Sequence, residues 1–308
     1  MSPRTLLLVD GHVHLHRAHG LKAFLDRAAA NLQAAAKLHA AANLYTVGDP
    51  HAAGDLYAAA GPHAAENASP AQGVLLFTEG AGVDRFGELA RWKGQPLPHA
   101  EGWRVEATEE DASLVLHSDG GASLLLVAGR QIRTAPGLEV LAPCTRQRFP
   151  DGEGFHETLA QVRAAGGPPV IPWGFGKWWG ARGWMVRTAM EAAEPGSLLL
   201  GDNGGRPRRA GVPTLVRVAR RRGIPVLAGT DPLPFPSEVR RVGGYGSVLT
   251  CPDLDPAHPA EAIRRALADA PPVLPTFGRR AGLPRFLWTQ ARMRAPARDD
   301  RARAGEPQ

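Results

Sequence analysis

The chain has 308 residues, 44% of them hydrophobic and 21% charged, which is enough apolar material for a sizeable core and excludes an intrinsically disordered protein. Its net charge is +6, but residues 279–308 hold eight Arg against three acidic residues and carry +5 of it, which argues against a domain-wide nucleic-acid-binding surface. Two widely spaced cysteines and the lack of a long apolar run exclude a disulfide framework and a membrane span, and predict a cytoplasmic protein.

The N-terminal part of the chain begins with a strand and a helix. Residues 5–10 are an apolar run bounded by Asp-Gly, which is typical of a strand buried on both faces. Apolar residues then recur at three- and four-residue spacing, which predicts an Ala-rich helix over 19–43. Glycine and proline interrupt residues 44–72, so we expect a loop there, with a helical turn at the sequence DLYAAA.

The rest of the chain contains a β-rich stretch within an alternation of strands and helices. Short β-prone runs and a Ser-Asp-Gly-Gly turn predict a β-hairpin insertion over about 101–143. Around it we predict strands at 73–80, 168–175, 197–203, 224–231 and 245–250 and helices at 83–92, 153–165, 183–193, 213–222 and 259–269. This alternation, with about eight strands, favours an α/β fold closed into a TIM-like (β/α) barrel. We expect a single barrel domain over 1–290 and a basic, disordered tail over 291–308.

The sequence DGHVHLH at the end of the first strand carries the strongest chemical signal. Side chains alternate along an extended strand, so Asp10, His12 and His14 are predicted to share one face with the leucines before them. Two neutral imidazoles two residues apart can bind one divalent ion, and water bound to zinc has its pKa lowered to about 7. His16 either joins them or lies in the following loop.

The sequence VDGHVHLH resembles the HxH signature of the amidohydrolase superfamily and of its TatD-like and polymerase-and-histidinol-phosphatase relatives. The sequence LAGTDP, with Asp231 at the end of a late strand, is similar to the Asp that serves those families as metal ligand and general base. The resemblance rests on these two motifs in their order along the chain. It implies a metal-dependent hydrolase in a distorted TIM barrel, with His12 and His14 as ligands and Asp231 as ligand or catalytic base.

The chain departs from that pattern in its middle strands, where these families usually supply two further histidines and often a carboxylated Lys or a Glu. At the corresponding strand ends stand Glu79, Lys177, Asp202 and Asn203. Two imidazoles with oxygen ligands from Asp231, Glu79 or Asp202 still suit zinc, manganese or magnesium, and more oxygen favours the last two. The alternatives are that Asp231 starts a turn before a proline, and that Glu79 and Asp202 cap helices or face solvent.

A second polar stretch, PWGFGKWWGARGW over 172–184, follows a middle strand. It holds four of the seven Trp, together with two cations and several glycines. Aromatic faces beside fixed cations suit an anionic or sugar-like ligand. We therefore expect it to bind substrate through Lys177, Arg182, Trp173 and Trp178. The alternative is that the tryptophans pack the rim of the barrel and the glycines turn the chain.

Together these patterns predict a metal-dependent hydrolase that acts on a small, anionic substrate through a metal-activated water. No GxSxG motif is present, so a serine nucleophile is not indicated. A first alternative is a barrel without metal that binds a sugar or phosphorylated metabolite through the Trp-rich stretch, and a second is a non-catalytic interaction protein that uses the basic tail. We expect no specific nucleic acid and no membrane as partner, because the aromatic residues do not interleave with the basic runs. The bond cleaved and the oligomeric state stay open.

Overall fold

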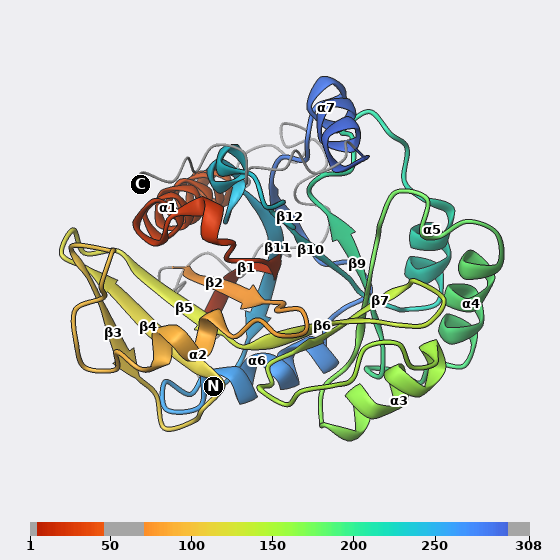
Figure 1. Cartoon of the computed structure of the whole chain (residues 1–308), viewed down its shortest axis with the longest axis horizontal. Helices are drawn as coiled ribbons and strands as arrows, with labels where there is room; N and C mark the ends of the chain where they lie inside the picture. Colours follow the sequence, from red (N-terminus) through yellow and green to blue (C-terminus); the bar gives the residue numbers. More distant parts are fainter. Residues whose placement is uncertain (1–4, 46–70, 295–308) are drawn as a thin grey trace, which may run out of the picture.

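The computed structural model describes residues 5–45 and 71–294, and its strands form two open, mixed sheets with helices packed around them (Figure 1). The predicted TIM-like (β/α) barrel is wrong, because such a barrel needs one closed sheet of parallel strands. Most of the predicted loop over 44–72, with its helical turn, lies outside the described residues, as does the tail from residue 295.

The first sheet has seven strands in the order β12-β11-β1-β2-β5-β4-β3. Its strands are β1 (Thr5–Val13), β2 (Gln72–Phe77), β3 (Trp103–Ala107), β4 (Ser113–Ser118), β5 (Ser123–Val127), β11 (Tyr245–Cys251) and β12 (Thr276–Gly278). β2 runs parallel to β1 and β5, whereas β11 is antiparallel to β1, and β3, β4 and β5 form an antiparallel meander. The meander contains the predicted Ser-Asp-Gly-Gly turn between β4 and β5, so half of the predicted insertion extends this sheet.

The second sheet has five strands in the order β10-β9-β8-β7-β6. Its strands are β6 (Gly129–Arg133), β7 (Glu139–Pro143), β8 (Val170–Pro172), β9 (Leu199–Asn203) and β10 (Val226–Gly229). β8, β9 and β10 are parallel, as their alternation with helices predicts, but β7 is antiparallel to both β6 and β8. A single residue, Ala128, separates β5 from β6, so the chain crosses between the sheets without the long connection that a parallel neighbour needs.

The helices of the described part follow the predicted pattern except at the C-terminal end. They are α1 (Leu21–Tyr45), α2 (Arg85–Ala90), α3 (Phe155–Ala164), α4 (Gly180–Glu191), α5 (Thr214–Arg221), α6 (Pro259–Ala268) and α7 (Leu283–Arg294), with the short 3-10 helices η1 (Arg17–His19) and η2 (Pro236–Arg241). α7 was not predicted from the sequence because it buries only Phe286 and Thr289 and so lacks a continuous apolar stripe. None of the helices described is long and apolar enough to cross a membrane.

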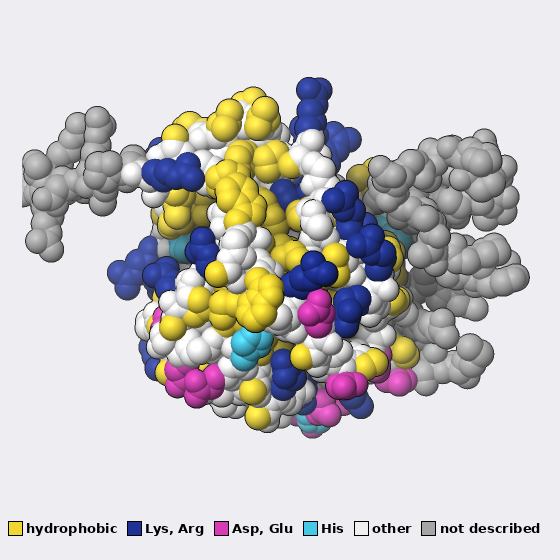
Figure 2. All heavy atoms as spheres, turned by 90° about the vertical axis from the view of Figure 1, so that its right-hand side faces the viewer, with side chains coloured by type: hydrophobic (Ala, Val, Ile, Leu, Met, Phe, Trp, Pro, Cys, Tyr) yellow, Lys and Arg dark blue, Asp and Glu magenta, His cyan; other side chains and the backbone are white. Residues whose placement is uncertain are grey.

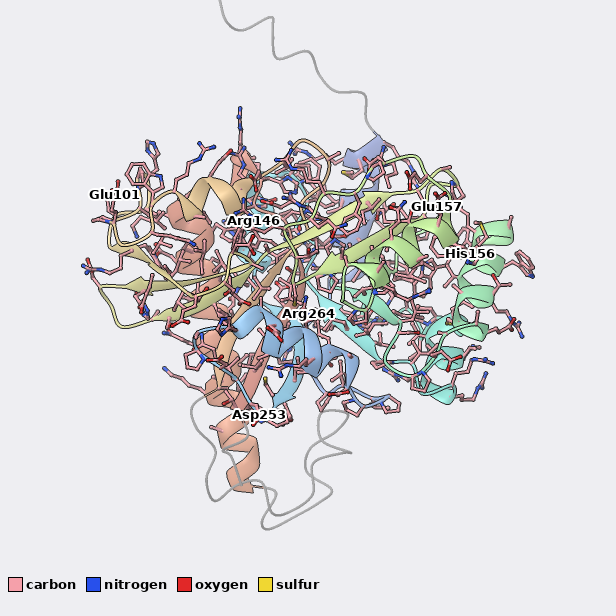
Figure 3. The ribbon with its side chains drawn as sticks, turned by 90° about the horizontal axis from the view of Figure 1, so that it is seen from below. Glu101, Arg146, His156, Glu157, Asp253 and Arg264 are labelled. Carbon is pink, nitrogen blue, oxygen red and sulfur yellow. The ribbon has the colours of Figure 1, made fainter. Side chains whose placement is uncertain are left out.

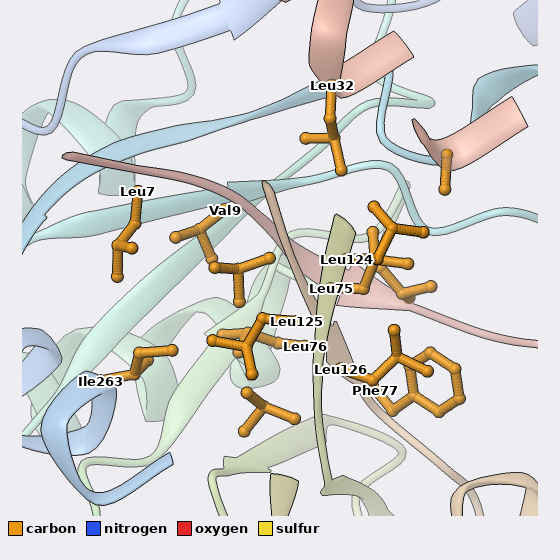
Figure 4. Packing of buried hydrophobic residues seen from close by; sticks show 14 of the residues in the cluster. Leu7, Val9, Leu32, Leu75, Leu76, Phe77, Leu124, Leu125, Leu126 and Ile263 are labelled. Carbon is orange, nitrogen blue, oxygen red and sulfur yellow. The ribbon is translucent and has the colours of Figure 1, made fainter. Parts of the chain in front are cut away.

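Each sheet carries its own hydrophobic cluster. In the larger one, leucines of β1, β2 and β5 pack together, and Leu32 of α1 and Ile263 of α6 join them from the surrounding helices (Figure 4). In the smaller one, residues of β7, β8 and β9 pack against α3, α4 and α5. Burying such side chains stabilises the fold by about 1.5–3 kcal/mol each. The two clusters fix each sheet separately, and the polar residues of interest lie where the sheets meet.

The two sheets touch where β1 lies beside β10. The backbone N–H of Asp231 donates to the carbonyl oxygen of His12, with an N–O distance of 2.8 Å. The backbones are so close that a Cβ atom added to Gly229 would lie 2.3 Å from the backbone nitrogen of His12, so only glycine fits. Nearby, Gln131 of β6 donates its backbone N–H to Glu79 after β2, at 2.9 Å. The ends of β1, β2, β6 and β10 therefore meet in one junction.

An irregularity in β1 lies between Asp10 and Val13 and includes His12. Asp10 pairs with Leu75 and Val13 with Phe77, so three residue steps in β1 face two in β2, which interrupts the alternation expected for Asp10, His12 and His14. The buried Asp10 carboxylate accepts hydrogen bonds from Thr230 and Gly243. Burial raises the pKa of Asp10 to about 6 despite these bonds. Asp10 thus ties β1 to two later segments.

Candidate metal centre

Three side chains converge at the junction between the sheets: those of His12, His14 and Asp231. The Nε2 atoms of the two histidines are 3.0 Å apart, and each lies 3.6 Å from Oδ1 of Asp231. His12 ends the first strand, His14 follows it, and Asp231 follows β10. The fold therefore brings together the two motifs that the sequence singled out, although they are more than two hundred residues apart.

The spacing of these atoms suits one divalent ion. A point equidistant from three atoms so separated lies about 2.0 Å from each, the usual length of a bond from zinc to an imidazole nitrogen or a carboxylate oxygen. Burial and the neighbouring His12 lower the pKa of His14 well below its ordinary value, so its ring is neutral near pH 7. A neutral imidazole is the form that ligates metals.

Asp231 is held by its backbone and by Asn203. Its φ of 46° lies in the left-handed region, which few residues other than glycine adopt and which is often found at functional sites. Oδ2 of Asp231 accepts a hydrogen bond from the side-chain amide of Asn203, which leaves Oδ1 facing the histidines. Burial alone would raise the pKa of Asp231, but His12, His14 and the Asn203 amide outweigh it and lower the pKa, so the carboxylate is ionised at neutral pH.

Gln131 is a residue of this centre that the sequence did not reveal. Its Oε1 lies 2.9 Å from Nε2 of His12. It stands in the β-prone run GRQIR, where one amide among strand-forming residues carries no chemical signal. Its place follows from the pairing of β6 with Glu79 at the junction, a long-range contact that a local pattern does not encode. Asn203, noted only as a neighbour of Asp202, is the other supporting residue.

The carboxylates of Glu79 and Asp202, considered as further ligands, lie outside this group and have partners of their own. Glu79 accepts the backbone N–H of Phe86 at 2.9 Å and pairs with Arg130 at 3.1 Å. Asp202 accepts two bonds from the guanidinium of Arg206, at 2.7 and 2.8 Å, and one from the hydroxyl of Tyr245 at 2.7 Å. These ion pairs fix the strand ends on either side of the centre.

His16, which the sequence left between ligand and loop, belongs to the loop. Its Nε2 lies 3.1 Å from the carbonyl oxygen of Pro232, the residue after Asp231. Its ring centroid is 5.5 Å from that of His14, so it stands beside the centre. It therefore links the segment after β1 to the segment after β10 without entering the group of three.

In the Trp-rich stretch, the four side chains predicted to bind substrate each contact neighbouring groups of the protein. Lys177 pairs with Glu139 at 2.5 Å, and Arg182 donates to the carbonyl of Gly176 at 3.0 Å. Trp173 packs against the smaller hydrophobic cluster, and Trp178 is a member of it. The face that carries α4 and α5 shows hydrophobic side chains among Lys and Arg (Figure 2). The charge of Lys177 also helps to lower the pKa of Asp231, and a role of these four residues in substrate binding stays a prediction.

No protein-family model matches the chain, and no curated protein matches it. A similar solved structure is the crystal structure of PsfC from Pseudomonas syringae PB-5123, at 14% sequence identity. The alignment covers 95% of this chain and 98% of that chain, with a TM-score of 0.49. A likeness at this level assigns neither a fold family nor an activity, so the function has to be argued from the site.

Proposed function

We propose that this chain is a metal-dependent hydrolase of small, anionic substrates, in which His12, His14 and Asp231 bind one divalent ion. The observation that carries the proposal is the convergence of two Nε2 atoms and one carboxylate oxygen within 3.6 Å of one another. Two imidazoles and one carboxylate form a common ligand set of catalytic zinc sites, which keep a further position open. The carbonyl oxygen of Gln131 adds a harder donor that also suits manganese or magnesium.

The residues of the centre have separate roles in such a reaction. When bound, the ion supplies a water of lowered pKa, about 7 for zinc. Oδ1 of Asp231 binds the ion or accepts the proton of the attacking water, for which its lowered pKa keeps it ionised. Asn203 fixes the carboxylate through Oδ2, so that Oδ1 has one orientation. Gln131 holds its amide oxygen 2.9 Å from Nε2 of His12, where it would serve as a further oxygen ligand to the ion.

The metal content of purified protein without a His tag tests the first half of the proposal. The wild type should carry about one divalent ion, and the His12→Ala, His14→Ala double variant should lose it because two of three ligands are gone. His156→Ala is the matched control, since His156 is an exposed residue of α3 far from the junction (Figure 3). An unchanged metal content in the double variant would overturn the metal site.

Hydrolysis assays test the second half. Wild-type protein should cleave at least one of three generic anionic substrates that contain a phosphoester, a carboxyl ester or an amide bond. A chelator should abolish the activity and added zinc or manganese should restore it, whereas the double variant should stay inactive. Metal-loaded wild type that cleaves none of the three bond types would contradict the enzymatic assignment while leaving the metal site intact.

A further inference from the structure

A large pocket lies beside the candidate metal centre. Its volume is about 690 Å³, and its walls come from the segment that follows β1, from α2 and from the segment after α2. Pockets that bind small molecules usually measure about 300–1,000 Å³. A second cavity, beside Glu79 and Gln131, measures only about 120 Å³ and is too small for more than a few water molecules. The larger pocket is therefore the better candidate for the body of a substrate.

His16 connects this pocket to the metal centre. It forms part of the pocket wall, and its ring centroid is 5.5 Å from that of His14. The hydrogen bond from its ring to the carbonyl of Pro232 holds it between the pocket and the segment that carries Asp231. A molecule in the pocket would thus lie next to the residues that we assign to the ion.

The floor of the pocket is apolar and partly aromatic. Leu89 and Leu97 are each 4% exposed and belong to the larger hydrophobic cluster. Trp92 stands at the same wall with 39% of its surface exposed, so its indole is accessible to a molecule in the pocket. A ligand with an apolar or aromatic body would bury these surfaces and could stack on the indole.

The rim of the pocket carries unpaired positive charge. Arg17 and Arg91 are exposed, and neither has an acidic partner among the described residues. Arg85 is also in the wall, but it pairs with Glu88, so that this pair is neutral. The pocket therefore has two free guanidinium groups over an apolar floor. Guanidinium groups bind carboxylate and phosphate oxygens in two-pronged hydrogen bonds.

We infer that this pocket binds the substrate, and that the substrate is a small molecule with an apolar or aromatic body and an oxyanion, which Arg17 and Arg91 hold. The inference rests on the proposed function, because it takes the pocket as the substrate site of that centre. It moves the anion-binding role away from Lys177 and Arg182, whose cations are already engaged by Glu139 and the carbonyl of Gly176.

Calorimetric titration of the full chain with three probes tests the inference: naphthoate, naphthyl phosphate and the neutral naphthol. We expect the anions to bind about tenfold more tightly than naphthol, because each charge-assisted hydrogen bond contributes more than about 1.4 kcal/mol. The preference between the two anions identifies the oxyanion. Equal affinity for naphthol and the anions, or no binding of any probe, would overturn the inference.

Variants identify the residues that bind the probes. The Arg17→Ala, Arg91→Ala double variant should lose about tenfold of the anion affinity and leave naphthol binding unchanged, and Trp92→Ala should weaken all three probes. The Arg220→Ala, Arg221→Ala double variant on the exposed face of α5 removes the same charge elsewhere and should bind as the wild type. Because Arg17 and Arg91 are exposed, the thermal transition should not move. Wild-type anion affinity in the Arg17, Arg91 variant would overturn the inference.

The titrations are run with and without chelator, so the two proposals fail separately. Anion binding that depends on Arg17 and Arg91 in chelator-treated protein would support the pocket without bearing on the metal site, whereas protein that carries no divalent ion as purified and takes up none when it is added would overturn the proposed function. Metal that depends on His12 and His14 in protein that binds none of the probes would overturn the pocket and support the metal site.

Discussion

At the junction between the sheets, three side chains from distant parts of the chain converge, whereas in the stretch 172–184 each cation pairs with a single acceptor, Lys177 with Glu139 and Arg182 with the carbonyl of Gly176. His12 lies in β1 of the first sheet and Asp231 follows β10 of the second, and Nε2 of His12 is 3.6 Å from Oδ1 of Asp231. Arg182 instead donates to the carbonyl of Gly176, only six residues earlier in the chain. Both cations of this stretch are thus already engaged by acceptors of the protein.

The difference between these two regions has a cause in the backbone. β1 and β10 approach each other closely at glycines. This close approach leaves room for side chains from both segments to lie next to one another. The Trp-rich stretch contacts other elements at the surface instead: Phe175 packs against Phe286 of α7, and Trp179 and Trp184 are each 66% exposed. Density of chemically interesting residues is thus a weaker indicator of a site than convergence of residues from different elements.

The largest expected effect comes from breaking the junction itself. In Gly229→Ala, the new Cβ would lie 2.3 Å from a backbone nitrogen, which cannot move aside as a flexible side chain can. We expect a loss of about 3 kcal/mol or more in the free energy of unfolding, measured by urea denaturation, together with loss of bound metal. Gly211→Ala is the control: its Cβ would meet nothing within 4 Å, so a change below about 1 kcal/mol is expected. Equal stability of the two variants would contradict the close approach of the sheets.

A smaller effect, on metal affinity, is expected when the hydrogen bond that orients one ligand is removed. Asn203→Ala removes the amide that holds Oδ2 of Asp231, and losing such a supporting hydrogen bond typically weakens metal binding about 10- to 100-fold. Competition with a chromophoric chelator measures the affinity. Asn31→Ala removes an amide that bonds the backbone of η2 and the residue after it, so it should leave metal affinity unchanged. Wild-type affinity in Asn203→Ala would show that the carboxylate does not need this bond.

The smallest effect is expected in the Trp-rich stretch. Lys177→Met breaks the pair with Glu139, which is partly solvent-exposed, so the free energy of unfolding should change by less than about 1 kcal/mol. Metal content and binding of naphthyl anions should stay at the wild-type level. A tenfold loss of metal content or of anion affinity would show that Lys177 takes part in binding, as the sequence predicted. The contrast between the two regions would then be wrong.

Much of the secondary structure could be predicted from the sequence, but the arrangement of the sheets could not. Periodic apolar spacing correctly predicted α1, and the run SLLLGDN correctly predicted β9. The direction in which β7 and β11 pair is set by long-range contacts: β7 runs antiparallel to β8 and β11 runs antiparallel to β1, where a barrel would have required parallel pairs. Strand count and alternation with helices therefore gave the wrong architecture.

The residues of the candidate site also fall into those that could be predicted from the sequence and those that could not. The convergence of His12, His14 and Asp231 could be predicted because HxH and GTDP are local signals at strand ends. Gln131 and the pocket beside His16 could not, because they depend on which strands and loops meet. Glu79 was considered as a ligand because it ends a strand, but the partner that occupies it, Arg130, is brought in by the second sheet.

The most direct test of the account is a cobalt titration followed by visible absorption, in the wild type and in the single variants His12→Ala, His14→Ala and Asp231→Ala. We expect saturation at about one equivalent in the wild type, with intense bands of a low-coordinate ion, and weaker binding with altered bands in every single variant. The Asp231 variant is the critical one, since only the fold brings that residue to the histidines. An Asp231→Ala protein that titrates with the affinity and spectrum of the wild type would contradict the account.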